Sequence, residues 1–149
     1  MKNKKPLSVG IWGNTDKENF WELLNPIIEW AERNVLETFI TTRIREKLKT
    51  EISDKIKTIK SAEDFLHIDF LIAMGGDGTI LSASRAIGDR GIPIIGIHLG
   101  RLGFMADITI DDMFQRLDQV ALGDFLIQQR MILKAEIVTK KDKKTYYCL

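Results

Sequence analysis

A glycine-rich segment with a carboxylate inside it, Gly75-Gly-Asp-Gly-Thr79, is the part of the sequence best suited to chemistry. Glycines let backbone N–H groups approach a ligand closely, and a helix that follows adds partial positive charge, so phosphate is the natural ligand. The segment lacks the lysine of the common phosphate loop, and Leu81 stands where the dinucleotide fingerprint needs its third glycine. A tight strand-to-helix turn without a ligand is the alternative interpretation.

Asp77 changes the balance between these two interpretations. A carboxylate in a phosphate-binding loop is unfavourable unless a divalent cation neutralises it or a hydroxyl offers it a proton. Both situations belong to phosphoryl transfer, where positioning and charge neutralisation supply most of the catalysis. The alternative is that Asp77 only accepts N–H hydrogen bonds that hold the turn.

A second motif, Gly96-Ile-His-Leu-Gly-Arg-Leu-Gly-Phe104, follows the first, and together they resemble the NAD kinases. The first motif is shared with lipid kinases of the diacylglycerol and sphingosine type and with phosphofructokinases, whereas the second is much more specific. The resemblance covers about residues 7–149. It implies transfer of the terminal phosphoryl group of ATP, or of polyphosphate, to the 2′-hydroxyl of the NAD adenosine ribose, with a divalent cation, Mg²⁺. A lipid kinase and a non-catalytic nucleotide-binding module are the alternative functions.

The resemblance also implies roles for individual residues. Asp77 corresponds to the proposed base for the ribose hydroxyl. The loop shared between NAD and the donor phosphates then comprises Gly75, Gly76, Gly78 and Thr79. No residue of the sequence is assigned as a ligand of the metal.

Four further positions are open to two interpretations each. Phe104 matches the family's aromatic residue near the adenine, with an ordinary core phenylalanine as the alternative. His98 either packs behind the site or contacts the ligand, and Arg101 lies either near phosphate or in solvent. Trp12, at a strand end, is interpreted as a core residue, with a place at the cleft as the alternative.

The elements that must position these motifs alternate along the chain. Apolar runs predict strands, and residues at helical spacing predict helices between them. This order predicts an α/β fold: a Rossmann-like, mostly parallel sheet with helices on both faces and the glycine segment at a carboxyl edge. The predicted strands lie near 7–12, 36–41, 68–74 and 92–97.

Two regions of the predicted fold are less regular. Thr15 and Glu18 form a candidate capping box, and Pro26 predicts either two helices or one kinked helix. The charge-rich residues 43–60 are interpreted as an amphipathic connection with a solvated face.

The pattern changes near the end of the sequence. Residues 1–124 are predicted to form the α/β phosphate-loop domain, and 125–149 to begin a second, β-rich domain. Alternating residues there predict three antiparallel strands, near 125–127, 132–138 and 145–149.

The NAD kinases carry an Asn-Glu pair that holds the ribose hydroxyls, after a strand like 146–149, and the given sequence ends there. We therefore expect the 149-residue chain to fold at least through Asp124 but to form no measurable NADP by itself.

The composition excludes several classes of protein. Twenty-two Lys and Arg against 21 Asp and Glu give a net charge of +1, which argues against a dedicated nucleic-acid binder. The single cysteine excludes an internal disulfide, and no apolar run reaches the ~20 residues of a membrane span. We expect a cytoplasmic protein whose partners are small nucleotides, and the resemblance implies a homo-oligomer for the intact parent.

Overall fold

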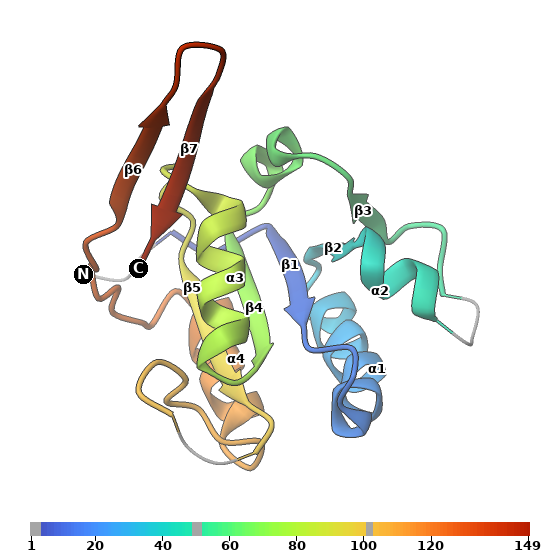
Figure 1. The fold of residues 1–149 in the computed structure, drawn as a ribbon. Helices are drawn as coiled ribbons and strands as arrows, with labels where there is room; N and C mark the ends of the chain where they lie inside the picture. The colour runs from blue at the N-terminus through green and yellow to red at the C-terminus, as the bar shows by residue number, and fades with distance from the viewer. Residues whose placement is uncertain (1–3, 49–51, 101–102) are drawn as a thin grey trace.

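A five-stranded parallel sheet forms the centre of the molecule in the computed structural model, which describes residues 4–48, 52–100 and 103–149 (Figure 1). The spatial order is β3-β2-β1-β4-β5, and all four pairings between neighbours are parallel. The predicted parallel sheet is therefore confirmed. The strands are β1 (Ser8–Gly13), β2 (Glu37–Thr41), β3 (Lys57–Ile59), β4 (Phe70–Gly75) and β5 (Ile94–His98).

Helices cover both faces of the sheet, as predicted (Figure 1). On one face, α1 (Glu18–Arg33) and α4 (Met113–Ala121) pack on alternate strand residues such as Ile72 and Met74. On the other, α3 (Asp77–Ile87) and the short 3₁₀ helix η1 (Ala62–His67) pack on the intervening Leu71 and Ala73. Because β4 is buried on both faces, its near-continuous apolar run suits a central parallel strand.

The start of α1 differs from the prediction. The helix begins at Glu18 with Lys17 as N-cap and no side-chain cap, so the expected Thr15–Glu18 capping box is wrong. Residues 14–17 form a turn instead, closed by a 3.1 Å hydrogen bond from the Lys17 N–H to the Asn14 carbonyl. The helix continues through Pro26 as one element because its apolar side chains on both sides of the proline are buried.

The charge-rich segment 43–60 contains structure that the sequence pattern did not reveal. It holds most of α2 (Thr42–Lys47) and the edge strand β3, with Ile44 and Ile56 buried. In its described residues the amphipathic character and the solvated face are confirmed, but the segment is more than a connection because it contains these two elements. The isoleucines of 43–60 stand at helical spacing, but they are shared between a six-residue helix and a three-residue strand, so tertiary packing and not the spacing determines the local structure.

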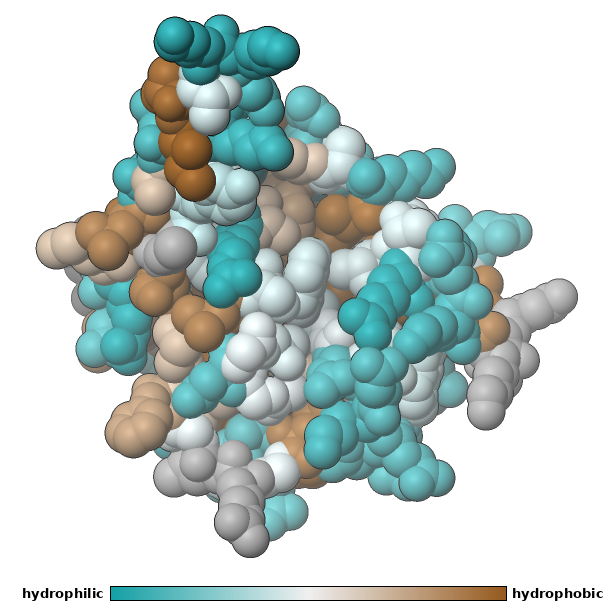
Figure 2. Space-filling model, in the orientation of Figure 1, coloured by the Kyte–Doolittle hydropathy of each residue, from teal (hydrophilic) through white to brown (hydrophobic). Residues whose placement is uncertain are grey.

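Residues 125–149 form a two-stranded antiparallel hairpin of β6 (Leu133–Val138) and β7 (Lys143–Cys148) that extends beside α3 (Figure 1). Hydrophobic side chains of the hairpin, including Leu133 and Val138, are exposed along it (Figure 2). The strand expected at 125–127 is absent, and Leu126 is 99% exposed. Assignment of this segment to a second domain stays a prediction. Among the described residues no helix combines the length and apolarity needed to cross a membrane.

Candidate functional site

The glycine segment lies where the strand order changes direction. From β1 the chain passes through α1 to β2 on one side, whereas β4 lies on the other side of β1. Ligands of open α/β sheets bind outside the carboxyl ends of the strands at such a switch point. Gly13 at the end of β1 pairs with Met74, so the residues that follow both strands meet at this edge.

The glycines of the segment have different neighbours. A Cβ atom on Gly75 would overlap the side chain of Thr79, so the protein's own packing requires glycine there. A Cβ on Gly76 or Gly78 would find no protein atom within 4 Å. Their bare backbone therefore faces open space, as a backbone that receives a ligand should.

Helix α3 begins within the motif, with Gly76 as N-cap and Asp77 as its first residue. The N–H groups of Thr79 and Ile80 donate to the Gly76 carbonyl, at 2.9 and 3.3 Å. The N–H groups of Asp77 and Gly78 have no carbonyl one turn back and remain for an anion at this positive helix end.

The carboxylate of Asp77 joins the two sequence motifs. Its Oδ2 accepts the N–H of Phe104 and its Oδ1 that of Met105, both at 3.0 Å. The pKa of Asp77 is held below its ordinary value of 3.8, mainly by the N–H of Phe104 and next by that of Met105. Burial acts in the opposite direction. The carboxylate is therefore ionised at neutral pH.

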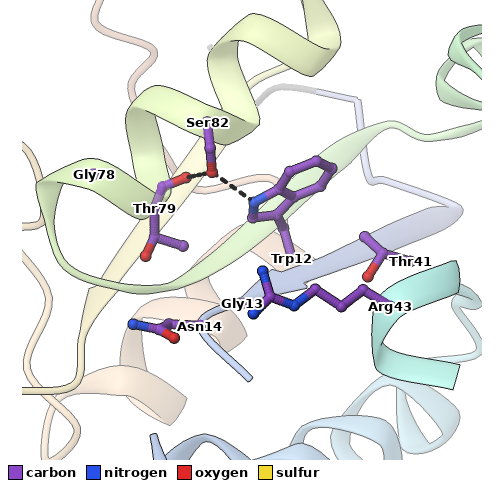
Figure 3. A pocket seen from close by; sticks show the side chains of 8 residues that line it. All are labelled: Trp12, Gly13, Asn14, Thr41, Arg43, Gly78, Thr79 and Ser82. Atoms are coloured by element: carbon purple, nitrogen blue, oxygen red, sulfur yellow. Dashed lines mark hydrogen bonds between the residues drawn. The ribbon is translucent and has the colours of Figure 1, made fainter. Parts of the chain in front are cut away.

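A pocket of about 400 Å³ opens beside the first turns of α3, and Asp77 is not among the residues that line it (Figure 3). Trp12 lines it and donates from Nε1 to Ser82 Oγ at 3.0 Å, and Ser82 Oγ donates to the Thr79 carbonyl at 2.8 Å. Trp12 is half-buried and packs against the core as well, so both interpretations of it hold in part. The lining residues come from β1, β2, α2 and α3 and the turn after β1: Trp12, Gly13, Asn14, Thr41, Arg43, Gly78, Thr79 and Ser82.

The second motif passes beside the first. His98, the last residue of β5, pairs in register with Gly75, and its Nδ1 lies 2.9 Å from the Gly100 carbonyl. Its Nε2 is buried without a hydrogen-bond partner among the described residues. Phe104 is 94% exposed, so the alternative of a core phenylalanine is wrong. Arg101 lies outside the described residues.

Sequence reasoning missed four pocket residues, Asn14, Thr41, Arg43 and Ser82. None belongs to either motif. The signal that could have found the first three is their position just after β1 or at and after the end of β2, because parallel strands bring their carboxyl ends to one edge. Ser82 lies on α3 one turn beyond the glycines.

A protein-borne metal site is not formed by this part of the chain. Within residues 4–48, 52–100 and 103–149, no three His, Cys, Asp or Glu side chains group closely enough to hold a metal ion.

Comparison with known proteins gives a consistent family match. The family model described as ATP-NAD kinase N-terminal domain matches residues 9–125. An NAD kinase of Heliobacterium modesticaldum is 30% identical over 147 residues, which cover 95% of this chain and 49% of that protein. An NAD kinase of Geobacter sp. (strain M21) is 36% identical over 115 residues, which cover 74% of this chain and 38% of that protein. The chain thus spans about half the length, or less, of these curated relatives.

One solved structure shows the same fold. The crystal structure of yeast NADH kinase complexed with NADH has a TM-score of 0.77 and 19% sequence identity to this chain. The match covers 97% of this chain and 47% of the yeast chain.

Proposed function

The chain belongs to the NAD kinase family, and from this premise we propose that it takes part in the transfer of the terminal phosphoryl group of ATP to NAD. The acceptor is the 2′-hydroxyl of the adenosine ribose, and the product is NADP. The main support for the proposal is that the carboxylate of Asp77, in the first motif, accepts hydrogen bonds from the backbone at the end of the second motif.

Asp77 serves in this proposal as the base that accepts the ribose proton. An ionised carboxylate has about four lone-pair sites, and the N–H groups of Phe104 and Met105 use two of them. The remaining sites can accept the ribose hydroxyl while the backbone holds the carboxylate in place. A low pKa makes Asp77 a weak base, but the loose transition state of phosphoryl transfer requires little proton removal before the phosphorus–oxygen bond breaks.

The glycine loop binds phosphate in this proposal. The N–H groups of Asp77 and Gly78 supply donors, and the open space at Gly76 and Gly78 lets phosphate oxygens reach the backbone. A divalent cation, Mg²⁺, enters on the phosphates of ATP, because the described residues offer no group of protein ligands for it. When bound, it neutralises charge on the transferred group.

The direct test is the reaction of the full-length protein with ATP or polyphosphate as donor and NAD or NADH as acceptor. We expect NADP from NAD, NADPH where NADH is accepted, and no phosphorylation of diacylglycerol or sphingosine in parallel assays. Lipid phosphorylation without NADP would contradict the proposal in favour of a lipid kinase. Binding of ATP and NAD in saturation-transfer NMR without turnover would favour a non-catalytic nucleotide-binding module.

The same assay tests the expectation that the 149-residue chain forms no NADP alone. We compare it with the chain extended by the C-terminal half of an NAD kinase relative, since this chain covers 49% of the Heliobacterium protein. Comparable rates from the two would contradict the expectation. We further propose a cytoplasmic homo-oligomer, which fluorescence localisation and light scattering of the full-length protein would test.

A further inference from the structure

Arg43 is the only charged residue among the eight that line the pocket beside the glycine loop. It lies on α2, across the pocket from Gly78 and Thr79, and its side chain extends from α2 toward Gly13 (Figure 3). The pocket therefore has a helix N-terminus on one wall, a cation on the other, and the end of β1 between them.

The counter-ion of Arg43 is shared. Asp16 accepts Arg43 Nη2 at 3.0 Å on one carboxylate oxygen and Lys47 Nζ at 2.8 Å on the other. Lys47 is also the larger cause of the lowered pKa of Asp16, ahead of Arg43. Asp16 therefore keeps a partner when Arg43 leaves it.

The pair holds Arg43 only weakly. The side chains of Arg43 and Asp16 are 59% and 66% exposed, and ion pairs in water at such exposure add little stability. A multiply charged phosphate has more charge than one carboxylate and accepts the guanidinium fork at two oxygens. Such an anion can therefore compete with Asp16 for the guanidinium of Arg43.

Asp77 does not line the pocket, because its carboxylate bonds to Phe104 and Met105. We propose that the pocket receives the phosphate chain of the phosphoryl donor and that Arg43 exchanges Asp16 for its outer phosphates. The acceptor then lies on the Asp77 side. The identification of a donor side and an acceptor side rests on the proposed function, whereas the binding of a phosphate chain in the pocket does not depend on it.

The test is calorimetric titration of ATP, inorganic tripolyphosphate and NAD into the 149-residue chain. Arg43→Gln should weaken binding of ATP and tripolyphosphate about 10-fold, the loss of a charged hydrogen-bond donor, with NAD affinity changed less than about 2-fold. Arg43→Lys should weaken the binding of ATP and tripolyphosphate less than Arg43→Gln does. Asp16→Asn, which frees Arg43, should tighten tripolyphosphate binding, and the gain should decline with added salt.

Arg33→Gln is the matched control, because it removes the same charge from the exposed last turn of α1, outside the pocket. If Arg43→Gln weakens tripolyphosphate binding no more than Arg33→Gln, or weakens NAD binding equally, the assignment is overturned. Absence of any ATP or tripolyphosphate binding by the wild-type chain overturns it as well. Loss of polyphosphate binding in Arg43→Gln, together with a full-length protein that forms no NADP, would support the anion site and contradict only the proposed function.

Discussion

A Cβ atom on Gly103 would overlap the carboxylate of Asp77, so this carboxylate reaches the N–H groups of Phe104 and Met105 only because residue 103 is glycine. The contact joins the last glycine of the second motif to the acid of the first. Asp77 therefore has a structural role that is visible in the contacts and a chemical role that we propose. The two roles predict different outcomes when the residue is changed.

Replacement of Asp77 by Asn should lower kcat for NADP formation by the full-length protein about 10²–10⁴-fold, the usual contribution of a general base. The amide keeps the size of the side chain but removes the charge that accepts the proton. Steady-state kinetics with NAD as the varied substrate measures the effect, and the KM for NAD should change much less than kcat.

The control for this prediction separates charge from position. Gly103→Ala keeps the carboxylate but displaces it, so this variant should also lower kcat. Gly91→Ala is the control variant, because Gly91 lies outside both motifs. Gly91 has a φ of +67°, so its replacement reports general backbone strain. Near-normal turnover in Asp77→Asn would reduce Asp77 to a residue that only holds the loop.

The pKa of Asp77 gives a prediction for stability against pH. The N–H groups of Phe104 and Met105 hold this pKa below its ordinary value of 3.8. A group with a lowered pKa in the folded state stabilises the fold fully above its unfolded pKa and loses that contribution as the pH falls through the folded value. The difference in unfolding free energy between wild type and Asp77→Asn should therefore be constant from about pH 5 to 7 and shrink below about pH 4.

Urea denaturation of both chains across this range measures the difference. Other acids with lowered pKa values, Asp16, Asp64 and Glu136, occur in both chains, so their effects cancel. A difference that stays the same below about pH 3, or disappears already near pH 6, would show that the carboxylate of Asp77 is not held as the structure has it.

The two kinds of glycine in the loop predict opposite effects. Gly78→Ala meets no protein atom and places a better helix former in the first turn of α3, so stability should stay equal or rise by up to ~1 kcal/mol. The added methyl group should nevertheless weaken ATP binding about 10-fold or more, because it occupies the space proposed for phosphate oxygens.

Gly75→Ala supplies the contrast, since its methyl group overlaps Thr79 and should destabilise the fold by about 1–3 kcal/mol. Thermal denaturation and calorimetric ATP titration of both variants test the pair of expectations. Unchanged ATP affinity in Gly78→Ala would show that the open space at this position is not used by phosphate.

The sequence predicted the sheet and the position of the glycine segment because both depend on local signals. The apolar run that became β4 and the glycines after it needed no knowledge of distant residues. The bond between Asp77 and Phe104 joins residues 27 positions apart, and that between Arg43 and Asp16 also spans 27. Contacts between residues so far apart in the sequence can be predicted only when the order of the strands in the sheet is known.

Local signals also misled in places. Thr15 and Glu18 have the spacing of a capping box, but the hydroxyl of Thr15 is buried and has no hydrogen-bond partner in the described part of the chain. In 43–60, a helical spacing of isoleucines is divided between α2 and β3, where Ile44 and Ile59 are buried in different core clusters. Periodicity could not reveal that division, because the two residues pack on opposite faces of the sheet.

Phe104 combines near-complete exposure with a backbone that is held by Asp77, and this combination makes its ring a good test of the acceptor side. A large aromatic ring that is 94% exposed contributes little to folding, so Phe104→Ala should leave thermal stability almost unchanged. If the ring stacks on the adenine of NAD, its loss should weaken NAD binding about 10-fold, as for a stacked base, and leave tripolyphosphate binding unaffected. Leu126→Ala is the matched control, since Leu126 is 99% exposed and lies outside both motifs. Calorimetric titration of NAD and tripolyphosphate into the three chains decides the matter: equal NAD affinity in Phe104→Ala and Leu126→Ala would remove Phe104 from the site, whereas a selective loss of NAD binding would place the acceptor beside Asp77.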